Sequence, residues 1–233
     1  MLFRSSPTGV VEAKALEAQG GMSAGGKLLT DNSRLRVRVA SSAEDTEEII
    51  TFFEQIASSE SWQPGDQLRA HITRSVYFGV WDEGCLVGGL QLVTPDEAGE
   101  VPTHRVWPEL AVIEASSLVL HAAVLAVLPD YRGKDGSTVF WQLGSVFWRH
   151  CVEKGVKTIW LEATPKMLRA YRLLGWPLVV IGELREHWGE PCYPCCLSVR
   201  EVAGSLAERA LVSTTYRRIF TAALQPQSIL PSR

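Results

Sequence analysis

A short glycine-containing loop is the segment best suited to chemistry. Residues 132–137 read R-G-K-D-G-S and follow a run of apolar residues. Glycines let backbone N–H groups approach phosphate oxygens, and a helix that starts after such a loop presents partial positive charge to an anion. Arg132 and Lys134 would add cationic contacts, whereas Asp135 brings a negative charge. The loop predicts a phosphate site at Arg132, Gly133, Lys134, Gly136 and Ser137. A turn with surface charges is the alternative.

The cysteines are the second set of reactive side chains. The sequence has five of them, an odd number in a chain too long to need disulfide staples, which favours reduced thiols. Residues 192–196 contain a C-x-x-C with His187 nearby, a composition that zinc sites share. A second pair with ligand spacing is missing, and CYPCCLSV has the pattern of an apolar strand. We therefore predict no metal site. Cys151 is set aside as a nucleophile because it falls on the apolar face of an expected helix.

Two motifs resemble those of the GNAT acyltransferases. The first, V-L-A-V-L-P-D-Y-R-G-K-D-G-S at residues 124–137, is similar to the strand, turn and helix start with which that family holds coenzyme pyrophosphate, although it is one residue shorter than R-G-x-G-x-G. The second, A-Y-R-L-L-G-W at residues 170–176, is similar to the family's A-x-x-Y-x-x-x-G-F helix. Both occur in the family's order, separated by one helix and one strand. The resemblance covers roughly residues 35–199.

The resemblance implies roles for particular residues. Tyr171 would protonate the departing thiolate, as a phenol of pKa about 10 can when it lies within hydrogen-bond reach. A tyrosine packed in the core is the alternative. The backbone groups of Leu125, Ala126 and Val127 would bond the thioester and its pantetheine amides.

Other segments resemble the branch of acyl-homoserine-lactone synthases and long-chain N-acyl amino acid synthases. VGGLQLVTP with HRVWPEL is similar to their G-x-x-R-L-x-P-T strand and F-P-x-L loop, and GWPLVVIG to their G-W-P-x-x-x-x-G segment. Gln91 stands where that branch has its first arginine, and Ser117 replaces the arginine expected after the serine. We therefore do not expect quorum-signal synthesis, while the wider acyltransferase prediction stands.

Two residues are candidates for the base that activates the amine. E-A-S-S-L-V-L, which starts at Glu114, resembles the branch's W-E-x-[ST]-R-F-x-V, so Glu114 is the base by this resemblance. However, AVIEASSLVL and HAAVLAVLP compete for the strand before the loop. If the second is the inner strand, His121 takes the position of the base. Either group can accept a proton directly or through water, and a buried structural role is the alternative for each.

The predicted function is N-acyl transfer from acetyl-CoA, a longer acyl-CoA or an acyl-carrier protein to a small-molecule amine, such as an amino acid or a derivative. The amine attacks the thioester carbonyl within a ternary complex, and backbone N–H groups stabilise the oxyanion. Two other hypotheses stay open: a catalytically weakened module of this fold that binds an acyl thioester as a sensor or partner, and an interaction protein without a thioester site. The acyl length, the amine and the oligomeric state are left open.

Hydrophobic periodicity gives the elements that must position these groups. The predicted strands are residues 35–40, 76–82, 85–93, 156–163, 177–182 and 191–199, with one more before the loop, and the predicted helices are 41–58, 137–155, 165–175 and 201–224. Residues 94–110 are expected to form a loop with a short helical piece. This order predicts an α/β (α+β) fold with a mixed central sheet and helices on both faces, and the resemblance to the GNAT family implies that the sheet is mostly antiparallel.

Composition limits the partners and the location. A net charge of -3 and a pI of about 6.0 provide no global basic field for nucleic acid. An uncharged apolar run of about 18 or more residues is missing, so no membrane partner is expected. Without a signal-like start, the cytoplasm is the default location. We expect a flexible N-terminal tail at residues 1–33, a single acyltransferase domain at 34–225 and a C-terminal tail at 226–233, with Met22 as a possible alternative start.

Overall fold

A computed structural model describes residues 35–113, 118–132, 137–214 and 216–217. Glu114, Gly133, Lys134 and Gly136 lie outside the described residues, as do both predicted tails and Met22. The strands are β1 (Leu35–Val39), β2 (Ser75–Asp82), β3 (Cys85–Val93), β4 (Val119–Val127), β5 (Thr158–Ala163), β6 (Val179–Val180), β7 (Arg185–His187) and β8 (Glu190–Ser198). The helices are α1 (Ala43–Ser59), α2 (Gln67–Ala70), α3 (Ser137–Glu153), α4 (Pro165–Leu173) and α5 (Val199–Val212), with 3-10 turns η1 (Ile72–Arg74), η2 (Pro102–Arg105) and η3 (Pro129–Tyr131).

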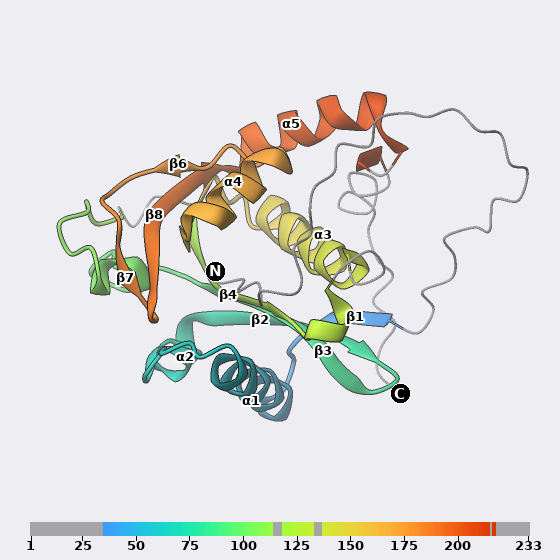
Figure 1. The fold of residues 1–233 in the computed structure, drawn as a ribbon, viewed down its shortest axis with the longest axis horizontal. Coiled ribbons are helices and arrows are strands. Elements are labelled where there is room, and N and C mark those ends of the chain that lie inside the picture. Colours follow the sequence, from blue (N-terminus) through green and yellow to red (C-terminus); the bar gives the residue numbers. More distant parts are fainter. Residues whose placement is uncertain (1–34, 114–117, 133–136, 215, 218–233) are drawn as a thin grey trace, which may run out of the picture.

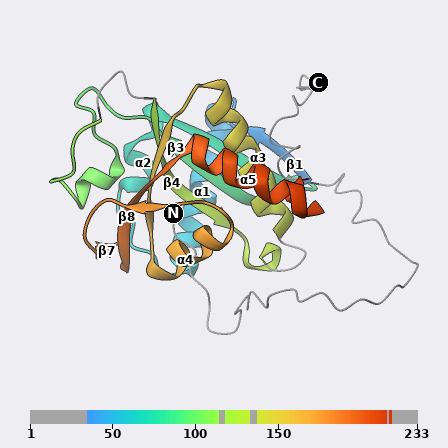
Figure 2. The same cartoon turned by 90° about the horizontal axis from the view of Figure 1, so that it is seen from above.

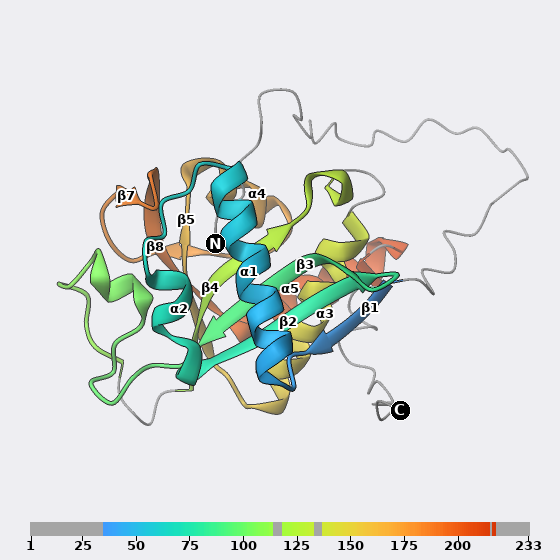
Figure 3. The ribbon, with the colours of Figure 1, turned by 90° about the horizontal axis from the view of Figure 1, so that it is seen from below.

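In the described residues, the strands form one sheet in the order β1-β2-β3-β4-β5-β8-β6, and β7 pairs with β8 outside this path. Every pairing is antiparallel except that of β4 with β5. Helices α3, α4 and α5 cover one face of the sheet, and α1 and α2 cover the other (Figures 1, 2 and 3). The predicted mixed sheet with helices on both faces is confirmed.

Helix α1 shows how local sequence sets an element. The Ser42 hydroxyl accepts a hydrogen bond from the backbone N–H of Asp45, and Glu44 and Asp45 place negative charge in the first turn. Its buried residues face β2, β3 and β4 and are Ile49, Ile50, Phe52, Phe53, Ile56 and Ala57. Burying each large side chain of this set contributes about 1.5–3 kcal/mol.

Glycines in β3 let helices approach the sheet from both faces. A Cβ on Gly88 would lie 2.5 Å from Val139 of α3, and a Cβ on Gly89 would lie 2.7 Å from Phe53 of α1. Both distances are too short for carbon atoms. The pair therefore lets α1 and α3 contact the centre of the sheet, beside β4.

Some predicted boundaries were wrong. The strand before the loop starts at Val119, and residues 111–113 have no regular structure, so HAAVLAVLP is the inner strand. Strand β6 is much shorter than predicted, and strand β7 was not predicted. Helix α5 starts at Val199 and ends at Val212, while residues 218–224 of the predicted helix lie outside the described residues. Within the described residues, no helix is both long and apolar enough to cross a bilayer.

Candidate active site

The parallel strands β4 and β5 separate soon after they meet. They pair from Val119–Thr158 to His121–Trp160, while β4 continues to Val127 and β5 to Ala163. Beyond His121, the edge of β4 that faces β5 has no strand partner in the described part of the chain. Backbone N–H and C=O groups on this edge can therefore bond a ligand, because buried backbone groups require partners.

A bulge in β4 lies at the same place. Gln91 of β3 pairs with Val124 and Leu92 with Ala122, so Ala123 has no partner residue in β3. Ala123 and Val124 both pack in the cluster on the α1 face, which breaks the alternation of the strand. The bulge changes the direction of the backbone groups that follow His121.

His121 and Glu162 form a buried polar pair at the start of this opening. The Nε2 atom of His121 lies 3.1 Å and 3.0 Å from the two carboxylate oxygens of Glu162. The side chains are 1% and 0% exposed. Leu120 and Ala122 belong to the α3-side cluster, so His121 lies on the opposite, α1 face of the sheet.

Thr103 and His187 also face the Glu162 carboxylate. The Thr103 hydroxyl donates to Glu162 Oε1 at 2.5 Å, and His187 Nε2 lies 4.0 Å from Oε2. Burial would raise the pKa of Glu162, but the charge and hydrogen bond of His121 and the charge of His187 outweigh it and hold that pKa below its usual range. Burial lowers the pKa of His187 to about 4, although the Glu162 charge opposes the shift. At pH 7, which lies above both pKa values, Glu162 is ionised and His187 is neutral, and His187 carries the charge that acts on Glu162 only in acid.

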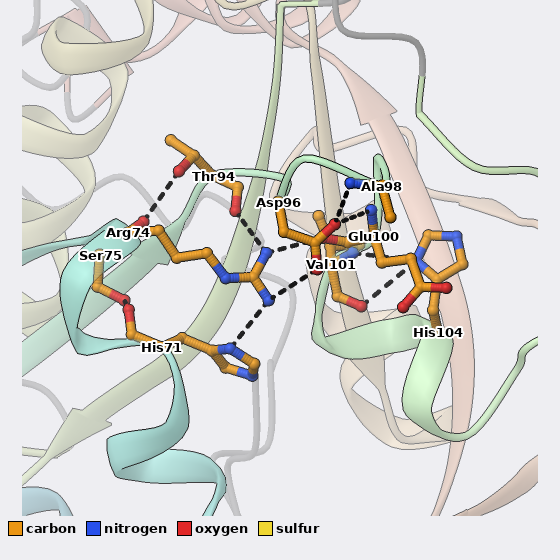
Figure 4. A network of polar contacts seen from close by, with 9 residues as sticks. All are labelled: His71, Arg74, Ser75, Thr94, Asp96, Ala98, Glu100, Val101 and His104. Carbon is orange, nitrogen blue, oxygen red and sulfur yellow. Dashed lines mark hydrogen bonds and ion pairs between the residues drawn. The ribbon is translucent and has the colours of Figure 1, made fainter.

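Arg74 fixes the loop that brings Thr103 to this pair. Its guanidinium donates to the carbonyl oxygens of Thr94 and Glu100 at 2.9 Å and 2.8 Å and lies 3.7 Å from the Asp96 carboxylate (Figure 4). Asp96 also accepts hydrogen bonds from backbone N–H groups within the loop. The loop is thus held in place before it enters η2, which carries Thr103.

On the α3 face, an apolar cavity of about 10 Å³ lies behind the opening. Ala122 and Leu125 of β4 line it, together with Gly144 of α3 and Trp176. This is roughly the space that one water molecule needs. The Tyr171 ring stacks on Trp176 with centroids 5.0 Å apart and planes 4° apart.

Three of the five cysteines, Cys151, Cys192 and Cys195, are buried. Burial raises the pKa of the Cys151, Cys192 and Cys195 thiols to about 12, so all three are neutral at pH 7. Among the described residues, no three His, Cys, Asp or Glu side chains gather in a way that could hold a metal ion.

The sequence model of the acetyltransferase (GNAT) family matches residues 43–176, more than half of the chain. The chain belongs to the acetyltransferase (GNAT) family. It is therefore an acyltransferase, as the two motifs predicted. No curated protein sequence matches it.

Solved structures share the GNAT fold seen here. The N-acyl amino acid synthase FeeM from uncultured soil microbes is similar with a TM-score of 0.62 and 16% identity, over 76% of this chain and 97% of that chain. The CoA-dependent acyl-homoserine lactone synthase BjaI is similar with a TM-score of 0.57 and 15% identity, over 77% of this chain and 91% of that chain. The AHL synthase LasI is similar with a TM-score of 0.56 and 11% identity, over 71% of this chain and 90% of that chain. At these identities the likeness shows the fold.

The residues predicted to bind the acyl donor lie at the C-terminal end of β4, where β4 has separated from β5 in this GNAT fold. Leu125, Ala126 and Val127 belong to the part of β4 beyond its pairing with β5. Arg132 is already engaged, because its Nε donates to the Val127 carbonyl and its Nη1 lies 2.7 Å from Glu60. Helix α3 begins at Ser137, directly after the part of the loop that lies outside the described residues. A phosphate-binding role for this loop stays a prediction.

The predicted acid and base lie on opposite faces of the GNAT sheet. Tyr171 is fully buried in the α3-side cluster, and burial raises the pKa of its hydroxyl above the usual value. His121 is on the α1 face. Sequence analysis missed Glu162 and Thr103, although a glutamate within the apolar strand IWLEA was an available signal.

Proposed function

We propose that this protein is an N-acyltransferase that moves an acyl group from a CoA or carrier-protein thioester to a small-molecule amine. The observation that carries the proposal is the opening between β4 and β5, with the buried imidazole of His121 where the strands part. FeeM is an N-acyl amino acid synthase and BjaI is CoA-dependent, which favours an amino acid or its derivative as the amine and CoA as the donor.

In the proposed reaction, the amine approaches from the α1 face and the thioester from the α3 face. His121 Nδ1 has no hydrogen-bond partner among the described residues, which leaves this nitrogen available to accept the proton of the amine. The amine nitrogen then forms a bond to the thioester carbonyl carbon, and backbone N–H groups on the open edge of β4 stabilise the oxyanion. The C–S bond breaks as the amide forms, and Tyr171 gives its proton to the sulfur.

The apolar cavity supports a place for the acyl group. It borders the unpaired part of β4 through Ala122 and Leu125, so an acyl group bound at the opening would enter it. Its volume of about 10 Å³ has room for about one water molecule, so a longer acyl chain would enter only if the side chains around the cavity moved.

Thioester turnover with a panel of amines tests the proposal. Wild-type protein is expected to release free thiol from an acyl-CoA in the presence of its amine, and His121→Gln should lower the rate roughly 10²- to 10⁴-fold. CoA should still raise the melting temperature of both proteins, because the proposed base does not bind the CoA part of the acyl donor. A melting shift without turnover of any amine would instead favour the thioester-binding module. An absence of both would remove the donor site.

A further inference from the structure

Glu162 is a carboxylate fully buried in the apolar strand β5, where an unpaired charge would be costly. We infer that Glu162 is a positioning residue, which holds His121 as the tautomer with its proton on Nε2 and leaves Nδ1 to accept the proton of the amine. The inference rests on the proposed function, since it gives the base of that reaction its orientation.

The hydrogen-bond chemistry of the pair leaves one arrangement. An ionised carboxylate has only acceptor sites, so the Nε2 atom that lies 3.0 Å from Glu162 must carry the hydrogen. In a neutral imidazole the other nitrogen is then an acceptor, and the bond at one nitrogen sets the tautomer. Nδ1 of His121 is buried and has no hydrogen-bond partner within the described part of the chain. The structure therefore keeps a basic lone pair in place for a substrate.

Glu162 is itself held in orientation from another part of the fold. The Thr103 hydroxyl donates to Oε1 at 2.5 Å, so this oxygen accepts from both Thr103 and His121. Thr103 lies in η2, at the end of the loop that Arg74 fastens (Figure 4). A conformational change of the carboxylate would break these bonds.

The second imidazole near Glu162 does not take over the carboxylate. His187 Nε2 lies 4.0 Å from Oε2, which is beyond hydrogen-bond distance, and its ring stacks on Trp188 with centroids 5.2 Å apart. His187 therefore does not compete with His121 for a hydrogen bond to the Glu162 carboxylate.

Nitrogen-15 NMR of the full chain, labelled at histidine, tests the inference without any substrate. Wild-type His121 is expected to show its proton on Nε2 at a pH where the ring is neutral. In Glu162→Gln that bias should be lost, because the amide can donate to Nε2 as well as accept from it. Glu186→Gln makes the same change at an exposed position of β7 and should leave the tautomer unchanged.

Kinetics on the same proteins separate positioning from packing. Glu162→Gln should lower kcat roughly 10²- to 10⁴-fold and leave the KM for the thioester within about twofold, as when a base adopts the wrong tautomer. An unchanged His121 tautomer in Glu162→Gln would overturn the inference, whatever the turnover. If the tautomer changes but even the wild type cleaves no thioester, the proposed function fails and the control of the tautomer by Glu162 stands.

Should Glu162→Gln fail to fold, Thr103→Val serves as the second variant. It keeps the carboxylate and removes the hydroxyl that holds it, so a partial loss of the tautomer bias and a kcat about three- to tenfold lower are expected. Wild-type values of both quantities in Thr103→Val would contradict the inference.

Discussion

At the scale of single residues, Tyr171 is a core residue to which we assign the role of the proposed acid. Its ring is fully buried and stacks on Trp176, which borders the apolar cavity behind β4. Burial raises the pKa of its hydroxyl, so the phenol stays protonated at any working pH. A protonated phenol next to the thioester sulfur can donate as the thiolate leaves.

We expect Tyr171→Phe to lower kcat roughly 10²- to 10⁴-fold while thioester affinity stays nearly unchanged. The substitution removes only the hydroxyl, and the ring stack on Trp176 remains. Turnover and melting temperature should be measured on the same preparation. Tyr77→Phe is the matched control, since its buried hydroxyl accepts from Gln91, and its loss should cost about 1 kcal/mol of stability without a selective loss of rate. The opposite result, a destabilised Tyr171→Phe with normal turnover, would assign Tyr171 to the core.

Arg132 has a structural partner that the loop sequence did not reveal. Its side chain is 24% exposed and lies 2.7 Å from the carboxylate of Glu60, which is 7% exposed. Glu60 follows α1, far from the loop in sequence. A phosphate contact would therefore come in addition to this ion pair.

A double variant separates the two roles of Arg132. Arg132→Gln should destabilise the fold by about 1–3 kcal/mol, because it leaves Glu60 buried without this cation, and should weaken CoA binding more than tenfold. Adding Glu60→Gln should restore much of the stability but none of the affinity. Urea unfolding and calorimetry with CoA measure the two quantities. Recovery of both would show that Arg132 affects binding only through the fold.

How far the site could be predicted depends on the sequence distance between its parts. His121 and Tyr171 could be proposed from sequence because each lies in a local segment that a strand or a helix carries. Thr103, Glu162 and His187 meet only when η2, β5 and β7 assemble, and no local pattern encodes that meeting. A glutamate in an apolar strand indicates a buried partner but not its identity.

At the scale of elements, the divergence of β4 from β5 creates the opening on which the proposed site depends. Hydrophobic periodicity predicted both strands, and the βαβ crossover through α3 makes them parallel neighbours. It could not predict where pairing stops, because that depends on the bulge at Ala123 and on the helices that pack on each face. Short elements such as β7 were missed since three residues show no period.

Gly144 of helix α3 leaves space behind the opening, because it has no side chain. This residue is buried and lines the apolar cavity, and an added Cβ would meet no atom within 4 Å. We expect Gly144→Ala to stabilise the fold by about 0.5–1 kcal/mol, because alanine favours a helix over glycine. If the acyl group enters the cavity, kcat/KM should also fall more for long acyl-CoA substrates than for acetyl-CoA.

Gly204→Ala provides the control for the helix effect. Gly204 lies in α5, is exposed, and likewise has no atom within 4 Å of an added Cβ. The same gain in stability is expected there without any change in acyl preference. If Gly144→Ala and Gly204→Ala showed the same preference among acyl-CoA chain lengths, the acyl group would not occupy the cavity.

At the scale of the whole molecule, buried titratable groups tie the stability of the fold to pH. Burial lowers the pKa of His187 to about 4, and burial with the charge of Arg74 lowers that of the half-buried His71 to about 4. Both rings are neutral when folded but take up a proton when unfolded, below a pKa of about 6.5. The Glu162 pKa is held low, so the unfolded chain also binds this proton more readily. All three groups make the unfolded state bind more protons in acid, so stability falls as the pH is lowered.

We expect the free energy of unfolding to be nearly constant between about pH 7.5 and 6.5 and to fall between pH 6.5 and about 4, as His187 becomes charged only in the unfolded chain. A difference of roughly 2.5 pKa units corresponds to about 3 kcal/mol for His187, and the contribution of His71 is smaller because solvent screens it. Urea unfolding at pH 7.5, 6.5, 5.5 and 4.5 measures the slope. His187→Phe keeps an aromatic ring against Trp188 and removes the titration, so it should lose most of the slope above pH 4.5, whereas Glu162 contributes below that value. A slope that is the same in His187→Phe and the wild type would mean that His187 is not the buried base that destabilises the fold in acid.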